Sequence, residues 1–446
     1  AEGRELRASE NPYILARLYR GVQPIAESFL EFGALNFAHR QRVSEPLRDI
    51  LRPIEKLGAM NEFQTYMVAR RALELSKRGI ELPPTFTRAN LASVVNAGRE
   101  RFGEAFKQLR DYQTNVLKYL RDSGVLNKET FDLIQEANRD YVPFNRVFAQ
   151  GEESTGTTGL RAALNPIKRI KGSTRDIVNP VESIIRNTYM LVTLAERNRV
   201  MSALVDLQKS NPDISLLIPK KAGNRAIKLG EADFSKLLEP YLTEGALKEL
   251  QSKISDVDFT VWRKNMFIQG NDVVHMENGK PKVYEVQDIE LAEALSAMDR
   301  EALSPVIKVL AYPSTLLRTG AILSPDFMAR NAVRDTISAT IFSKDGFIPF
   351  YDTFRGMGHV LGRTKLAQDW AASGGMFSHM QAIDARYMDK GVKDMLRNIP
   401  MRNMMKNPIE QLRMLSGLIE QGTRVAAFER TMTRALKQGK SRMDAL

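Results

Sequence analysis

The chain has 446 residues, of which 43% are hydrophobic and 26% are charged, and its formal net charge is +12. This composition excludes a largely disordered chain, and the length suits two or three hydrophobic cores, because a single core stops growing near ~250–300 residues. The absence of cysteine excludes disulfides and thiolate-ligated metal sites. The excess positive charge either attracts nucleic acid, anionic lipid or an acidic protein surface, or is simply a solvated basic surface.

The sequence carries no pattern typical of a signal peptide, because its first eleven residues are polar and charged. The longest apolar stretch, 305–323, is interrupted by Lys308 and Arg318. It therefore favours a buried or amphipathic helix over a membrane span, which needs ~20 mostly apolar residues. The chain begins without a helix cap and ends in a helix-start pattern from Ser441 to Asp444. We therefore expect an ordered part of a longer polypeptide.

Residues 1–150 are predicted to form an N-terminal helical region. Apolar residues recur three and four positions apart over 12–33, where Pro12 suits a helix start and Gly33 a helix end. Further helices are predicted over 45–57, 62–78, 88–123 and 128–140. The glycine- and threonine-rich segment that follows predicts a mobile basic linker over 151–175. A connecting helix is then expected over 176–209, starting near Pro180.

Residues 210–290 are predicted to form a small α+β insert. Strand patterns occur at 215–218, 225–229, 257–262 and 272–276, and short helical patterns at 234–238 and 244–252. Asn278-Gly279 stands between two β-rich runs and predicts a hairpin. Residues 291–446 are predicted to be a C-terminal helical region whose last helix spans 408–437. The predicted fold class is mainly α, a multi-helix elongated assembly with a small α+β insert that contains a β-hairpin.

Motifs for catalysis do not assemble in this sequence. Neither a Gly-x-Ser-x-Gly elbow nor a phosphate-binding loop is present. The histidines are scattered, and His275, on the predicted hairpin, is interpreted as a surface residue. We therefore predict no catalytic residue, no metal site, no cofactor and no small-molecule substrate for this segment, while an unseen pair of acids and the activity of the full-length parent stay open.

Two acid-free basic runs are candidate contacts for an anion or a nucleic acid. The residues are Arg161, Lys168, Arg169, Lys171 and Arg175 in the first run, and Arg434, Lys437, Lys440 and Arg442 in the second. Such runs could neutralise phosphates without sequence preference. The alternative is solvated charge at a helix end, where Lys437 and Lys440 suit the helix dipole.

The run 324–335 resembles the Pro-x-Phe-x-x-Arg-Asn-x-x-Arg-Asp core of the large polyvalent protein associated domain, which occurs in very large proteins of tailed phages and mobile elements. The matching residues are Pro325, Phe327, Arg330, Asn331, Arg334 and Asp335. The stretches 12–18, 141–144, 278–288 and 419–428 fit the same family in order. On a helix from Pro325 we expect Phe327, Ala332 and Ile337 to face inward. We expect Arg330, Arg334 and Asp335 to form a buried arginine network.

The resemblance implies a structural segment of a larger phage protein, expected to be an internal virion protein ejected with the genome as part of a DNA-delivery assembly. It implies a homo-oligomer in contact with other virion proteins, located in the virion interior and then in the host cell envelope. DNA and a membrane surface stay open as further partners. The alternative is a non-catalytic nucleic-acid-binding accessory region of a phage polymerase, helicase or antirestriction polyprotein. A hidden enzyme in the 210–290 insert is a third hypothesis.

Overall fold

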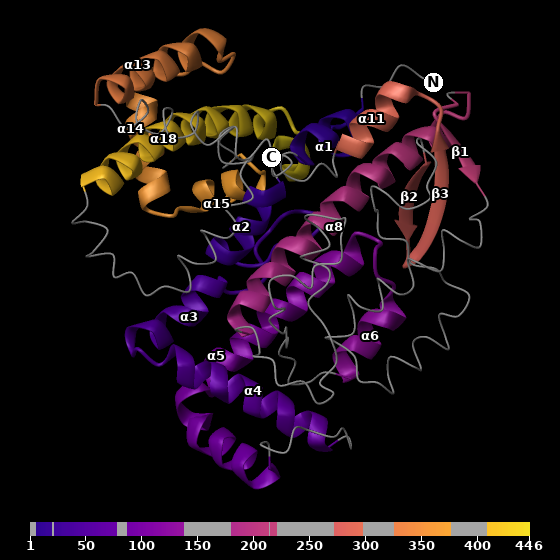
Figure 1. Cartoon of the computed structure of the whole chain (residues 1–446). Coiled ribbons are helices and arrows are strands. Elements are labelled where there is room, and N and C mark those ends of the chain that lie inside the picture. The colour runs from indigo at the N-terminus through magenta and orange to yellow at the C-terminus, as the bar shows by residue number, and fades with distance from the viewer. Residues whose placement is uncertain are drawn as a thin grey trace, which may run out of the picture. The chain divides into compact units, whose positions relative to one another are not determined.

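The computed structural model is mainly α-helical with one small antiparallel sheet, which confirms the predicted fold class (Figure 1). Its contacts cluster into two compact units. The first unit comprises Ala1–Val22 and Phe29–Glu301, and the second comprises Gln23–Ser28 and Ala302–Leu446. The structure describes residues 6–19, 22–77, 87–137, 180–213, 215–220, 272–297, 325–375 and 408–446.

Helices make up most of the described residues up to 297, and their bounds follow the sequence patterns closely. They are η1 (Ala8–Glu10), α1 (Pro12–Tyr19), α2 (Val22–Phe32), α3 (Leu47–Lys56), α4 (Met60–Lys77), α5 (Arg88–Asp122), α6 (Lys128–Ala137), α8 (Pro180–Ser210) and α11 (Ile289–Ala297). The helix predicted over 12–33 is described as α1 and α2. Gly33 ends α2 at φ +101°, where a side chain would also collide with the carbonyl oxygen of Ser44.

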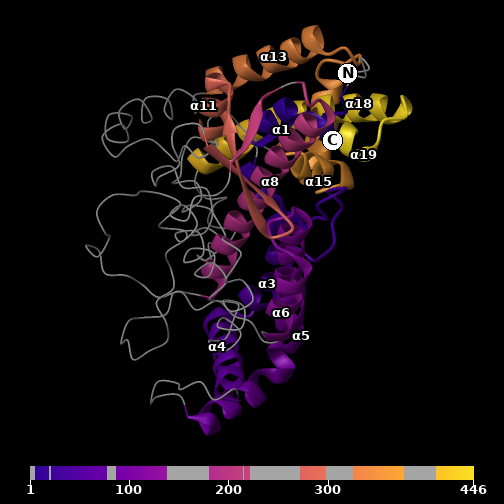
Figure 2. The ribbon, with the colours of Figure 1, turned by 90° about the vertical axis from the view of Figure 1, so that its right-hand side faces the viewer.

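The long helix α5 organises the first core. Thr87 caps its start by accepting a hydrogen bond from the backbone N–H of Asn90 at 3.3 Å. Its buried stripe packs against α4, which lies beside it in Figure 2, and against α8. Gly98 lets the Tyr66 ring approach, because a Cβ there would lie 2.5 Å from that ring. The buried residues of α5 are Leu91, Val95, Gly98, Phe102, Phe106, Leu109, Tyr112, Val116, Leu117, Tyr119 and Leu120.

The sheet has the strand order β1-β3-β2, with β1 at Leu217–Lys220, β2 at Asp272–Glu277 and β3 at Lys280–Val286. Val274 pairs with Val283 across the hairpin, and both pairings in the sheet are antiparallel. Asn278 and Gly279 turn the hairpin with φ angles of +51° and +73°, as a two-residue type I′ turn requires. The predicted hairpin is confirmed. The other strand and helix predictions between 221 and 271, and the predicted linker at 151–175, lie outside the described residues.

The side-chain amide of Asn198 helps to fasten this hairpin to the helices. Asn198, on α8, donates through Nδ2 to the carbonyl oxygens of Ser123 at 2.7 Å and Met276 at 2.8 Å. Its Oδ1 accepts the backbone N–H of Met276 at 2.9 Å. Beside it, the backbone N–H of Gly279 donates to the carbonyl oxygen of Gly124 at 2.9 Å. The hairpin tip is therefore fixed against the turn that follows α5.

The second unit is an arrangement of helices along α18. Its helices are α13 (Pro325–Phe342), α14 (Tyr351–Leu361), α15 (Lys365–Ala372), α18 (Pro408–Lys437) and α19 (Arg442–Ala445), and α18 has the predicted bounds. The α14 and α18 backbones approach closely at two glycines, since a Cβ on Gly356 would lie 1.9 Å from the carbonyl oxygen of Gly422. Among the described helices, none combines the length and the apolar character needed to cross a bilayer.

Candidate functional site: the helices around α18

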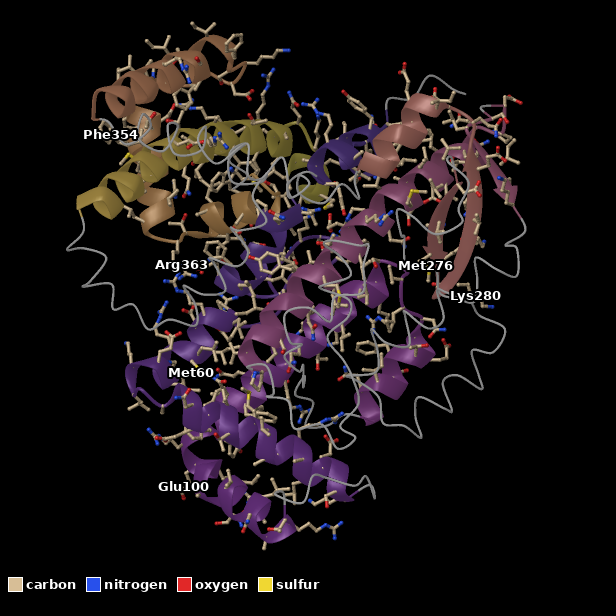
Figure 3. The ribbon with its side chains drawn as sticks, viewed as in Figure 1. Met60, Glu100, Met276, Lys280, Phe354 and Arg363 are labelled. Carbon is tan, nitrogen blue, oxygen red and sulfur yellow. The ribbon has the colours of Figure 1, made fainter. Side chains whose placement is uncertain are left out.

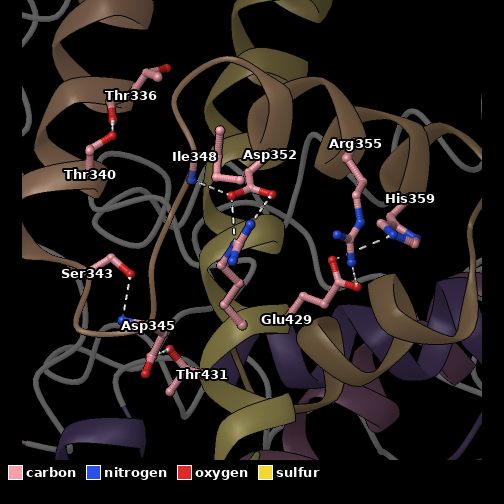
Figure 4. Close-up of polar contacts among 11 residues, drawn as sticks. Thr336, Thr340, Ser343, Asp345, Ile348, Asp352, Arg355, His359, Glu429 and Thr431 are labelled. Carbon is pink, nitrogen blue, oxygen red and sulfur yellow. Dashed lines mark hydrogen bonds and ion pairs between the residues drawn. The ribbon is translucent and has the colours of Figure 1, made fainter.

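A buried carboxylate joins the start of α14 to α18 (Figure 4). Asp352 is 1% exposed, and its Oδ2 accepts the backbone N–H of Ile348 at 2.6 Å. Arg430 donates to both carboxylate oxygens, from Nε at 2.7 Å and from Nη2 at 3.0 Å. This two-point pairing fixes orientation as well as distance, because the guanidinium is planar.

Three further ion pairs lie in the same unit. Arg434 donates from Nη1 to Asp345 at 2.7 Å, and this hydrogen bond is the main cause that lowers the pKa of Asp345. Glu429 pairs with Arg355, as Figure 4 shows. Arg442, at the start of α19, pairs with Asp369 on α15. The ion pairs of this unit therefore join α14 and the residues before it to α18, and α15 to α19.

The predicted anion contacts in the second basic run separate into two kinds. Arg434 and Arg442 each meet a carboxylate within the chain, so their charges are already compensated. Lys437 and Lys440 are exposed and form no ion pair with any described residue. The first predicted run, Arg161 to Arg175, lies outside the described residues, so its role stays a prediction.

A row of threonines joins α13 to α14 and α18. The Thr353 hydroxyl lies 3.3 Å from that of Thr336 and 3.2 Å from that of Thr423. All three residues are buried. Because each hydroxyl can donate one bond and accept others, the row satisfies polar groups that would be costly to bury alone.

The structure confirms that a helix begins at Pro325 but corrects which way it faces. Ile337 is 47% exposed and Arg334 is also exposed, so the predictions of an inward Ile337 and a buried Arg334 are wrong. The inner side of α13 instead carries Thr336, in the threonine row. The side chains of Phe327, Arg330, Asn331 and Asp335 are outside the described ones, so the rest of that network stays a prediction.

A group of large apolar side chains on α13, on α14 and between them is exposed. We call it the apolar face, and its residues are Val333, Ile337, Ile341, Phe342, Ile348, Phe350, Tyr351, Phe354 and Leu361. Phe354 is 67% exposed on α14 (Figure 3), and Phe350 adopts φ +61°, which is rare for an aromatic residue. Sequence reasoning missed this face, although the four-residue spacing from Val333 to Ile341 marks it. An apolar stripe on a helix ordinarily indicates the buried side.

The first unit contains its own buried charge network, which sequence reasoning also missed. Glu196, on α8, accepts from Arg40 at 2.5 Å, from Arg199 at 3.3 Å and from the Tyr119 hydroxyl. Burial alone would raise the pKa of Glu196, but the Arg199 and Arg40 charges outweigh it and lower the pKa. Arg199 also donates to the Phe37 carbonyl at 2.7 Å. The two guanidinium groups therefore share one carboxylate, and the network joins α5, α8 and the segment after α2.

His275 is 4% exposed, so its interpretation as a surface residue is wrong. The helix α8 covers β2, and the Ser202 hydroxyl lies 3.0 Å from Nε2 of His275. Burial is the main cause that lowers the pKa of His275, which favours the neutral ring. The buried Nδ1 has no hydrogen-bond partner among the described residues, so the acid that would orient this ring in a catalytic triad is not found there.

Within the described ranges, no group of three or more histidines and acids is placed to hold a metal ion. The chain matches no family model, no curated protein and no solved structure. Residues 324–335 therefore remain the basis of the family resemblance.

Proposed function

We propose that this chain is a non-enzymatic structural segment of a larger phage protein, an internal virion protein that is ejected with the genome and forms part of a DNA-delivery assembly. The observation that carries the proposal is the use of the buried charges. Glu196, on α8, pairs with Arg40 of the segment after α2, and Asp352, on α14, pairs with Arg430 of α18. Removing one partner of such a pair is strongly destabilising, so these groups are suited to holding a fixed helical shape.

In this proposal the protein assembles with copies of itself and with other virion proteins, first in the virion interior and later in the host cell envelope. The family resemblance of 324–335 supports the phage setting. The exposed apolar side chains on α13, on α14 and between them support a need for partners, because many exposed apolar residues in one part of a chain are typical of interaction sites.

Sedimentation velocity and negative-stain electron microscopy of the whole chain test the proposal. We expect a mass that rises with protein concentration and ring- or tube-shaped particles at the upper end of the series. The same series at high salt separates apolar assembly, which persists, from purely electrostatic clustering, which dissolves. A protein that stays monomeric throughout and binds neither duplex DNA nor liposomes would overturn the proposal.

The alternative, a nucleic-acid-binding accessory region of a phage polymerase, helicase or antirestriction polyprotein, is favoured by one observation. Lys437 and Lys440 stand exposed at the end of α18 without an ion pair to any described residue. This alternative expects binding to duplex DNA that weakens steeply as salt rises. Alanine at Lys168, Arg169 and Lys171 would weaken the same binding if the first basic run takes part.

A further inference from the structure

The contact between β2 and α8 buries a histidine ring that is held from one side. β2 is an edge strand of the sheet, and it packs against α8 (Figure 1). His275 is 4% exposed in this contact, and Val273, on the same side of the strand, is 1% exposed. The Ser202 hydroxyl of α8 lies 3.0 Å from Nε2 of the ring. The buried Nδ1 has no hydrogen-bond partner among the described residues.

The neutral ring fits this contact, whereas the protonated ring does not. A neutral imidazole can direct its single N–H at Ser202 and leave Nδ1 as an acceptor without a donor. Protonation of His275 places an N–H on Nδ1 as well, in a buried position where no described group accepts it. In agreement with this geometry, burial is the main cause that lowers the pKa of His275. Uptake of a proton therefore destabilises the contact.

The charged groups around the ring offer it no spare carboxylate. They are Glu277 on β2, Asp206 and Lys209 on α8, and Lys282 on β3. Lys209 pairs with both acids, and Lys282, which stands opposite His275 in the strand register, also pairs with Glu277. On α11, which packs on the same hairpin, the acid whose side chain is described, Glu290, is exposed to solvent. Two acids and two lysines thus balance without a charge for the imidazolium.

Hydrogen bonds that fasten the hairpin lie next to this histidine. Met276 uses both its backbone N–H and its carbonyl oxygen to bind Asn198, which is one helical turn before Ser202 on α8. A movement that brings the His275 ring to water therefore also pulls on these hydrogen bonds. The core between α4 and α5 is different, because neither helix contains a histidine.

We propose that the contact between β2 and α8 is a pH-sensitive switch, in which a proton taken up by His275 releases the hairpin from α8 while α4 and α5 stay folded. In the released state both nitrogens of the ring bind water. A small sheet without its covering helix is only marginally stable, so the strands themselves loosen. This inference goes beyond the proposed function and does not depend on it.

Hydrogen exchange of the whole chain, followed by mass spectrometry at pH 7.5 and pH 5.5, tests the switch. Rates are corrected for the effect of pH on intrinsic amide exchange. We expect peptides from β2 and β3 to lose protection at pH 5.5, by up to about tenfold for each pH unit below the ordinary histidine pKa of about 6.5, since one proton is taken up. Peptides from α4 and α5 should keep their protection at both pH values.

Two variants and a control connect the response to the histidine. His275→Gln keeps a polar side chain in the contact but takes up no proton, so its hairpin should be equally protected at both pH values. Ser202→Asp places a carboxylate beside Nε2, which stabilises the protonated ring, and it should abolish the loss of protection in acid even if His275→Gln folds poorly. The control His39→Gln changes an exposed histidine and should retain the wild-type response.

Three results would contradict the switch. The first is a wild-type hairpin that is as well protected at pH 5.5 as at pH 7.5. The second is a wild-type response that persists in His275→Gln or in Ser202→Asp. The third is loss of protection in α4 and α5 together with the hairpin, which would show general unfolding in place of local release.

Discussion

Glu196 keeps a full charge in the protein interior because its surroundings replace the water that it loses. Two guanidinium groups and a phenol take the place of solvent, and the carboxylate pKa falls although burial opposes that change. Two of the partners come from sequence positions far from α8, since Arg40 is 156 residues and Tyr119 is 77 residues away, whereas Arg199 is on α8 itself. No local pattern in the sequence could have indicated this network. The same applies to His275, whose burial depends on α8 covering the hairpin.

Replacing Glu196 by Gln should lower the free energy of unfolding by about 3–5 kcal/mol, because Arg40 and Arg199 would stay buried without a counter-charge. Urea unfolding at neutral pH measures the change. The matched control is Glu45→Gln, which removes a carboxylate whose side chain is 60% exposed from its pair with Arg42. That change should cost no more than about 1 kcal/mol. Equal effects of the two substitutions would contradict the role assigned to Glu196.

The pKa of His275 is lowered in the folded protein, so the unfolded chain binds a proton more readily than the folded one. The free energy of unfolding should therefore have its full value above the ordinary histidine pKa of about 6.5 and should fall as the pH drops below it. Urea midpoints between pH 8 and pH 5 measure this slope. His275→Gln should flatten the slope, whereas His39→Gln, at an exposed position, should leave it unchanged. A slope that His275→Gln does not alter would exclude this histidine as its source.

At the scale of single elements, the ends of helices and the hairpin were predictable because their signals are local. Pro180 begins α8, Gly33 ends α2 and Asn278-Gly279 turns the hairpin. The direction in which α13 faces was not predictable from its own residues. Its inner side packs through Thr336 against Thr353, so polar residues take the buried side and Ile337 faces outward.

The α14–α18 crossing gives a prediction with a control on the same helix. Gly356→Ala should destabilise the protein by about 1–3 kcal/mol, because its Cβ would meet the Gly422 backbone and the helices would have to separate. Gly358→Ala should instead stabilise it by about 0.5–1 kcal/mol, since no atom lies within 4 Å and alanine favours the helix. Thermal unfolding of both variants checks the opposite signs. If both substitutions changed stability in the same direction, helix propensity and not the close helix crossing would determine their effect.

At the scale of the whole molecule, the net charge of +12 was evident from composition, but its distribution was not. Ion pairs over long sequence separations compensate many arginines, such as Arg434 with Asp345. The exposed lysines at the end of α18 form no such pair with described residues. Which cations stay available to an anionic partner is therefore decided by folding.

If the end of α18 contacts nucleic acid, Lys437→Ala with Lys440→Ala should reduce the slope of log affinity against log salt by about 2, since each phosphate contact contributes about 0.9. Fluorescence anisotropy with duplex DNA over a salt series measures the slope. The control is Lys209→Ala with Lys282→Ala, which removes the same charge from residues paired with Glu277. That variant should retain the wild-type slope. Equal slopes for all three proteins would remove the α18 lysines from any DNA contact.

The hydrogen bonds between the Asn198 side chain and the hairpin also set an order of events during synthesis on the ribosome. Its partner Met276 follows 78 residues later in the chain. Translation adds about 5–20 residues per second, so these hydrogen bonds can form only several seconds later, when the hairpin has left the exit tunnel. During that interval the amide of Asn198 and the hydroxyl of Ser202 face water. We therefore expect the hairpin to be added late, to a nascent helical core that has already formed.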